Sequence, residues 1–274
     1  MLYGIITLGS YLLDKLEFDE VLVLSKLSIN YLIWTFFIMI VCWGTCILCS
    51  LLGISLSDSY LLYIPYLLGA LSPTIASFIS IKCNDKTKKF KDWLSDIFDF
   101  KHNILSYLMV VILSVLFILP QCIISGYQSG APLIAIVFMI PIMLLGGGLE
   151  EAGWRYILQP ELEKKCNLIV STLLVSVIWW LWHLPLFFIQ GVSQYGQDFF
   201  AFGINVLGVS FALSGIRKTS GSVWLCVLFH CIINSLLGIY IVNNNIIGNT
   251  VSSVTLILIS LVLVKVNDKK KILK

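Results

Sequence analysis

Five ionisable side chains interrupt apolar stretches in the second half of this 274-residue chain. They are Glu150, Glu151, Arg155, His183 and His230. Glutamate and histidine commonly act as general bases, and a base of this kind can activate a water molecule. Because a charge at the centre of a bilayer costs at least about 2.5–3.5 kcal/mol, ionisable groups inside apolar helices are candidates for function. The set predicts a buried site with acid–base chemistry.

The spacing within the first cluster assigns separate roles to its two carboxylates. Residues i and i+4 share a helix face, so Glu151 and Arg155 are placed to form an ion pair. Glu150 is turned about 100° from Glu151 and is not aligned with Arg155. We therefore expect Arg155 to neutralise Glu151, and Glu150 to face a cavity as the general base.

The histidines have polar and aromatic neighbours at helical spacing. His230 and Asn234 are also i and i+4, so an imidazole and an amide would point to one place, where they could hold water or donate to a developing oxyanion. Trp179 lies one turn before His183 and could wall the site. Taken singly, each residue could instead be a packing group, since intramembrane His and Asn often hydrogen-bond between helices. Ionisable groups on three helices nevertheless exceed what a passive bundle needs.

The composition indicates a membrane protein. Hydrophobic residues make up 58% of the chain, charged residues only 12%, and the mean hydropathy is +0.95. A soluble domain carries about 25% charged residues. Apolar runs of about 20 residues can each cross a bilayer, and continuous rather than alternating runs favour helices over a barrel. The predicted fold is all-α, a polytopic bundle of about eight transmembrane helices, with spans near 29–51, 60–81, 104–125, 132–155, 168–189, 199–216, 222–241 and 250–266.

Basic residues alternate from linker to linker. The linkers 82–103 and 156–167, the pair Arg217 and Lys218, and the C-terminal tail carry the basic residues. The intervening linkers 52–59, 126–131, 190–198 and 242–249 have no Lys or Arg. Because cytoplasmic loops are enriched in Lys and Arg, we expect both termini to be cytoplasmic, in a multi-pass protein of the cell membrane.

The organisation along the chain is simple. We expect one membrane-embedded domain over 1–274, with its motif core at about 140–240. The polar linker 82–103 is expected to be a solvated loop. Met1–Leu13 is apolar but lacks a basic start, which favours an amphipathic or re-entrant approach to the first span over a signal peptide. No nucleic-acid partner is expected; the partners would be membrane lipid and a membrane-bound substrate.

Three motifs in this order resemble those of the CAAX protease and bacteriocin-processing family (CPBP, or Abi), a family of multi-spanning membrane proteins. Its E-E-x-x-x-R corresponds to Glu150–Arg155, its F-x-x-x-H to Trp179–His183, and its H-x-x-x-N/D to His230–Asn234. The resemblance covers roughly 140–240. Trp179 stands where the family has phenylalanine, a change that preserves bulk and that we do not expect to affect the chemistry.

The resemblance implies an intramembrane endopeptidase, similar to CAAX prenyl endopeptidases. The implied catalytic set is Glu150, Glu151, Arg155, His183, His230 and Asn234. In this family the first glutamate activates a water molecule, while the histidines and the asparagine position it or stabilise the tetrahedral intermediate. The substrate would be a membrane-associated peptide, prenylated at its C-terminus in some relatives.

Family members are usually called metalloproteases, so zinc is a candidate cofactor. Glu150, His183 and His230 could supply three zinc ligands with one open position. Glu151 would then have to be the base, which conflicts with its pairing to Arg155. A metal-free mechanism gives each residue one role, and we favour it.

Two other classes of function stay open at this stage. A non-catalytic bacteriocin self-immunity or scaffold protein would share the fold, although the complete motif set argues against it. A proton-coupled transporter could also bury Glu, His and Arg. Transporters, however, commonly show repeat symmetry and paired broken helices, and here only the fourth span looks broken.

Overall fold

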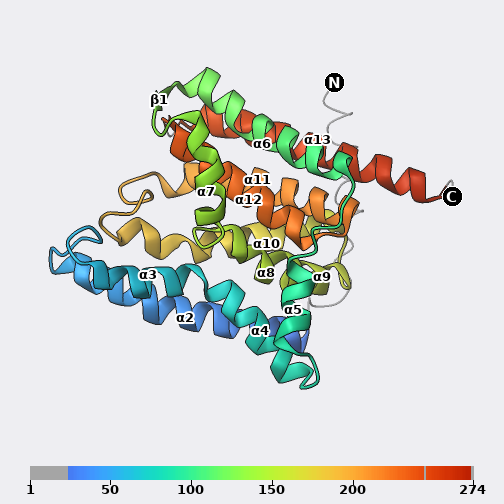
Figure 1. The fold of residues 1–274 in the computed structure, drawn as a ribbon, viewed down its shortest axis with the longest axis horizontal. Coiled ribbons are helices and arrows are strands. Elements are labelled where there is room, and N and C mark those ends of the chain that lie inside the picture. Colours follow the sequence, from blue (N-terminus) through green and yellow to red (C-terminus); the bar gives the residue numbers. More distant parts are fainter. Residues whose placement is uncertain (1–23, 244, 273–274) are drawn as a thin grey trace, which may run out of the picture.

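The computed structural model describes residues 24–243 and 245–272, and within these ranges the chain is almost entirely helical (Figure 1). The two strands, β1 (Tyr127–Ser129) and β2 (Tyr240–Val242), pair antiparallel at one end of the bundle. The predicted all-α polytopic bundle is confirmed. The predicted approach segment Met1–Leu13 lies outside the described residues.

Each of the eight predicted spans corresponds to a helix or to a bent helix pair. In the described part of the chain, five helices are long and apolar enough to cross a membrane, or up to seven if each bent pair counts as one span. The eighth, α12, is apolar but has only 17 residues. The elements are α2 (Lys26–Leu51), η1 (Tyr60–Leu62) with α3 (Tyr63–Ala70) and α4 (Ser72–Asn84), α6 (Ile104–Ser125), η2 (Leu133–Ala135) with α7 (Ile136–Met143), α10 (Leu168–Trp182) with η5 (Leu184–Phe188), α11 (Phe199–Ser220), α12 (Val223–Ile239) and α13 (Ile246–Ile272).

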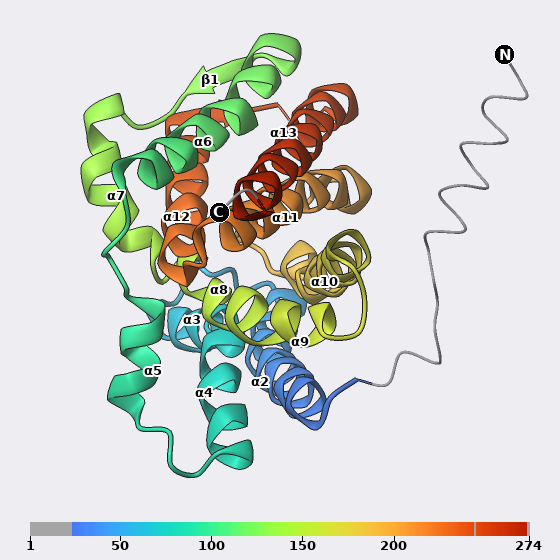
Figure 2. The same ribbon diagram turned by 90° about the vertical axis from the view of Figure 1, so that its right-hand side faces the viewer.

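The helices form layers around a central group. Helices α6 and α13 lie together on one side, and α2, α3 and α4 lie on the other, with α8 (Glu151–Gly153), α10, α11 and α12 between them (Figure 2). Helices α11 and α13 approach each other closely at Gly208, where a Cβ would come within 2.5 Å of Ser253 Cα. Small residues at such crossings let helices pack in lipid, where there is no hydrophobic driving force between them.

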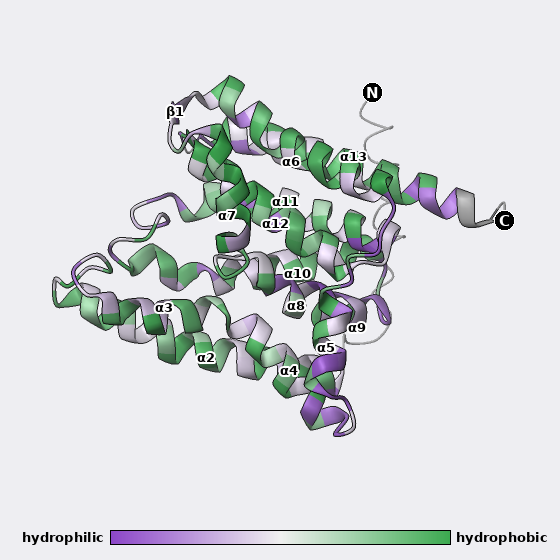
Figure 3. Cartoon of the chain, viewed as in Figure 1, coloured by the Kyte–Doolittle hydropathy of each residue, from purple (hydrophilic) through white to green (hydrophobic). Residues whose placement is uncertain are grey.

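The two ends of the bundle differ in polarity. Hydrophilic residues gather at the end that holds α5 and the C-terminal part of α13 (Figure 3). The linkers around 52–59, 126–131 and 190–198, which lack Lys and Arg, lie together at the opposite end (Figure 1). The fold thus places the basic linkers at one end, as alternating spans require, while the assignment of that end to the cytoplasm stays a prediction.

The basic linker is not the plain loop that we expected. Helix α5 (Phe90–Ile97) forms within it because Trp93 and Ile97, four residues apart, bury one face, and Trp93 Nε1 donates to Ser77 Oγ at 3.0 Å. Lys88 Nζ and the Tyr156 hydroxyl each donate to Asp96 at 2.6 Å. Partial burial acts to raise the pKa of Asp96, but these two hydrogen bonds outweigh it and hold the pKa below its ordinary value.

The expectation that only the fourth span is broken was wrong, because the second span also bends, by 50° between α3 and α4. The fourth span is broken where the sequence predicted irregularity. After α7 the chain passes through a glycine run and resumes as η3 (Gly148–Glu150), with a bend of 40° between the two halves. The second half continues as α8 (Glu151–Gly153), the π-helical η4 (Trp154–Leu158) and α9 (Gln159–Glu163). The candidate residues Glu150 and Glu151 therefore lie at the start of a half-helix inside the bundle.

Candidate active site

The turn before Glu150 is fixed by a glycine and by a neighbouring helix. Gly147 has φ +137°, a conformation that L side chains rarely adopt. A Cβ there would lie 2.6 Å from Asn234 Nδ2 and 2.9 Å from His230 Nε2. Thr74 Oγ1 on α4 donates to the Leu149 carbonyl at 2.7 Å. The two glutamates thus follow a backbone that is held on both sides.

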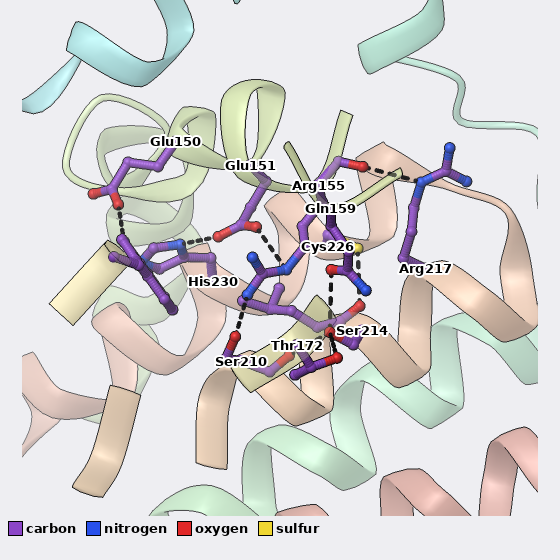
Figure 4. A network of polar contacts seen from close by, with 12 residues as sticks. Glu150, Glu151, Arg155, Gln159, Thr172, Ser210, Ser214, Arg217, Cys226 and His230 are labelled. Atoms are coloured by element: carbon purple, nitrogen blue, oxygen red, sulfur yellow. Dashed lines mark hydrogen bonds and ion pairs between the residues drawn. The ribbon is translucent and has the colours of Figure 1, made fainter. Parts of the chain in front are cut away.

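Glu151 is fully buried and bridges two partners. Its Oε1 lies 2.9 Å from His230 Nδ1, and its Oε2 lies 3.6 Å from Arg155 Nε (Figure 4). The predicted ion pair with Arg155 is present. The contact with His230 was not predicted, because it joins helices that are 79 residues apart in the chain.

Arg155 is anchored by more than Glu151. Its Nη2 donates to Ser210 Oγ on α11 at 3.0 Å, and its guanidinium carbon lies 5.5 Å from the centre of the Trp179 ring. The carbonyl of Arg155 accepts from Arg217 Nε at 3.3 Å. The cation is fully buried, and its Nε and Nη1 have no hydrogen-bond partner among the described residues, so the charge of Glu151 is its main compensation.

Glu150 points away from the ion pair, as expected. Figure 4 shows it on one side of Glu151, with Arg155 on the other. Its Oε2 accepts a 2.8 Å hydrogen bond from the indole Nε1 of Trp179. The expectation that tryptophan merely preserves bulk at this position was therefore wrong, because the phenylalanine of the family pattern has no N–H to donate.

Both histidines are held through Nδ1. His183 Nδ1 lies 2.7 Å from the Trp179 carbonyl, as His230 Nδ1 lies 2.9 Å from Glu151. The Trp179 ring separates the two imidazoles, with 5.5 Å between its centre and each of theirs. In both residues Nε2 is the nitrogen left for water or substrate.

Asn234 borders the same space as His230. Its Nδ2 donates to the Gly146 carbonyl at 2.9 Å, which leaves its second amide proton available. Since both Asn234 Nδ2 and His230 Nε2 lie within 3 Å of a Cβ position on Gly147, the predicted convergence of these two groups is present. Asn234 is half-buried, whereas the glutamates and histidines are buried.

The candidate zinc ligands meet one requirement of a zinc site but not a second. A histidine whose Nδ1 is held by a carboxylate or a carbonyl and whose Nε2 is free has the orientation usual in metal ligands. Three ligands must also converge, however, and in the described part of the chain no three His, Cys, Asp or Glu side chains are grouped to hold a metal ion. The candidate trio Glu150, His183 and His230 therefore does not form a three-ligand site in this arrangement.

Several neutral residues around the site were missed from the sequence. Beyond Arg155, a polar chain joins the helices: Thr172 donates to Ser214 at 2.9 Å, Ser214 to Gln159 at 3.1 Å, and Gln159 to Glu163 at 2.8 Å (Figure 4). The buried Tyr31 hydroxyl lies against Gly153, where any Cβ would collide with it. These Gln, Ser and Thr side chains are uncharged, so the sequence does not distinguish them from ordinary packing residues of membrane helices.

The chain is similar to known proteins over the part that contains these residues. The family model described as type II CAAX prenyl endopeptidase Rce1-like matches residues 132–236. The chain is also similar to CAAX prenyl protease 2 of Methanococcus maripaludis, with 26% identity over 229 residues, which cover 74% of this chain and 81% of that protein. The family match contains all six predicted catalytic residues. The resemblance drawn from the three motifs is thereby confirmed: over residues 132–236 this multi-pass membrane protein is similar to the Rce1-like type II CAAX prenyl endopeptidases.

Proposed function

We propose that the protein is an intramembrane endopeptidase in which Glu150 activates the attacking water. The observation that supports this role most directly is the different surroundings of the two adjacent glutamates. Glu151 is hydrogen-bonded to His230 through Oε1 and has the Arg155 cation 3.6 Å from Oε2, whereas Glu150 lies on the other side of Glu151 from Arg155 and accepts a hydrogen bond from the Trp179 indole through Oε2. A carboxylate that acts as a general base needs one oxygen free to accept a proton.

The proposed reaction is hydrolysis of a peptide bond. Glu150 takes a proton from water while the water oxygen bonds to the carbonyl carbon, and the carbonyl oxygen becomes an oxyanion. The amide N–H of Asn234 faces the space beside Gly147, and so does Nε2 of His230, which donates a hydrogen bond there when the ring is an imidazolium paired with Glu151. Both groups could then stabilise that charge. Glu150 then returns the proton to the nitrogen as the C–N bond breaks, giving a carboxylic acid and an amine.

His183 has a separate role in this scheme. Its Nδ1 is held by a backbone carbonyl, so in the neutral ring Nε2 accepts a hydrogen bond. An acceptor of this kind can orient the water molecule without competing for the oxyanion. Arg155 acts only through Glu151, which in turn orients His230.

The proposed substrate is a lipid-modified C-terminal peptide at the cell membrane. This assignment is supported by the name of the archaeal relative and by the buried position of the site. A soluble peptide would have to leave water to reach a buried glutamate, whereas a prenylated C-terminus already partitions into the bilayer.

The test is cleavage of a synthetic peptide by the purified protein in lipid nanodiscs. A peptide that ends in a farnesylated CAAX sequence should lose its last three residues, and the same peptide without the prenyl group should react much more slowly. Glu150→Ala should be inactive on both. Full biological activity in Glu150→Ala would instead favour the scaffold function, and pH-dependent solute uptake without cleavage would favour a transporter.

A further inference from the structure

We infer that Trp179 is a positioning residue for Glu150: its indole N–H fixes one carboxylate oxygen so that the other faces the attacking water. This inference rests on the proposed function and deepens it. It also gives a role to the one position at which this chain departs from the family pattern, where tryptophan stands in place of phenylalanine.

The contact is short and excluded from bulk water. Trp179 Nε1 lies 2.8 Å from Glu150 Oε2, Trp179 is 3% exposed and Glu150 is 6% exposed. Hydrogen bonds to a charged acceptor are about twice as strong as neutral ones, and burial strengthens them further. An indole has a single N–H, so it can fix only one oxygen of the carboxylate.

Trp179 also contacts both histidines of the candidate site. Its carbonyl accepts from His183 Nδ1 at 2.7 Å, and its ring packs between His183 and His230. Trp179 lies near the end of helix α10 and contacts Glu150 and both imidazoles, so it holds these three groups in place relative to one another. Phenylalanine would keep the ring contacts and the carbonyl, but it would lose the hold on Glu150.

Trp179→Phe therefore removes one N–H and little else. A hydrogen bond donated to a carboxylate favours its ionised form, so without the donor less of Glu150 is ionised at a given pH. We expect kcat/KM at neutral pH to fall roughly tenfold or more, with KM nearly unchanged. The acidic limb of the pH–rate profile should move to higher pH by about one unit or more, and the rate should partly recover at alkaline pH.

A pH profile can be attributed to Glu150 only if its other neighbours are unchanged. The titratable groups that interact with Glu150 through space are Tyr31, Tyr66, Glu151 and His230. All four are retained in Trp179→Phe. A general loss of folded protein would lower the whole profile without moving its acidic limb.

Trp180→Phe is the matched control. It lies on the same helix, and its Nε1 also donates one hydrogen bond, at 2.9 Å, but to the Phe199 carbonyl. Its ring packs on Phe199 and Phe200, away from the glutamates. We expect a comparable fall in melting temperature and an acidic limb at the wild-type position.

The experiment measures farnesyl-peptide cleavage from pH 5 to pH 9 with wild-type, Trp179→Phe and Trp180→Phe protein in nanodiscs. An unmoved acidic limb in folded Trp179→Phe would overturn the positioning role. If that variant does not fold, benzothienylalanine at position 179 keeps the shape of the indole and replaces its N–H with sulfur, and the same shift is expected. Wild-type protein that cleaves nothing would instead contradict the proposed function.

Discussion

Oε1 of Glu151 lies 2.9 Å from Nδ1 of His230, so the second glutamate of the first motif is bound to the histidine of the third motif across two helices. A carboxylate at Nδ1 fixes the tautomer and the orientation of an imidazole and leaves Nε2 toward the reacting groups. Glu151 therefore orients a neighbour, and Glu150 remains the candidate base. This difference in role between Glu150 and Glu151 can be tested by substitution.

Glu150→Gln should fold and lose turnover. The amide has the shape of the carboxylate and can still accept from Trp179 Nε1 through its oxygen. It cannot take a proton from water, and general-base catalysis is typically worth about 10²–10⁴-fold. Peptide cleavage should fall by at least that factor, with a melting temperature close to that of the wild type. Substantial turnover in this variant would exclude Glu150 as the base.

Glu151→Gln should lose stability as well as activity. It leaves Arg155 as a fully buried cation whose side chain is hydrogen-bonded to a neutral serine, Ser210. Breaking a buried ion pair costs about 3–5 kcal/mol. Since the partner of His230 also changes, activity per folded molecule should fall too. Loss of the ion pair with Arg155 would by itself lower only the amount of folded protein.

The double change Glu151→Gln with Arg155→Met separates the two effects. Removing the unpaired cation should recover part of the melting temperature, but activity should stay low because His230 still lacks a carboxylate at Nδ1. Thermal unfolding in detergent and peptide cleavage on the same samples provide the comparison. A double variant with restored turnover would show that Glu151 has no role beyond neutralising Arg155.

Gly147→Ala should abolish activity because the added methyl group would collide with residues of the candidate site. Its Cβ would press on Asn234 and His230, and its φ of +137° would be strained. The adjacent Gly146→Ala is the control, because its Cβ would first meet the flexible Met143 sulfur at 3.2 Å. We expect a loss of 10²-fold or more in the first variant, on the order expected when catalytic groups move by about 1 Å, and little change in the second. Equal activities would show that the space beside Gly147 is not used.

The helical bundle and the Glu151–Arg155 pair could be predicted from the sequence for a physical reason. Long apolar runs and helical spacing are local properties, so the spans and the Glu151–Arg155 pair could be read directly. The contacts from Trp179 to Glu150 and from Glu151 to His230 depend on how helices far apart in the chain pack. The helix α5 was missed because its apolar face is only Trp93 and Ile97 among many charges.

Metal dependence can be tested without changing a residue. We expect a stringent chelator to leave most of the cleavage activity, because Glu150 can activate water by itself in the proposed reaction. The measurement is peptide cleavage before and after dialysis against chelator, alongside metal analysis of the active protein. Stoichiometric zinc, with activity lost on its removal and restored on its return, would assign metal-ligand roles to Glu150, His183 and His230 instead.

The two ends of the bundle differ in their content of Lys and Arg, and this difference predicts the orientation of the protein in the membrane. Cytoplasmic loops are enriched in Lys and Arg, and the basic linkers share the end at which α5 lies. Single cysteines introduced at Ser57 and Gln194 in a cysteine-free background should therefore react with an impermeant thiol reagent added to intact cells. Cysteines at Lys86 and Lys164 should react only after the cells are lysed. Because the four positions lie on four different linkers, a reversed pattern at all of them would place both termini outside, and a mixed pattern would contradict the number of spans.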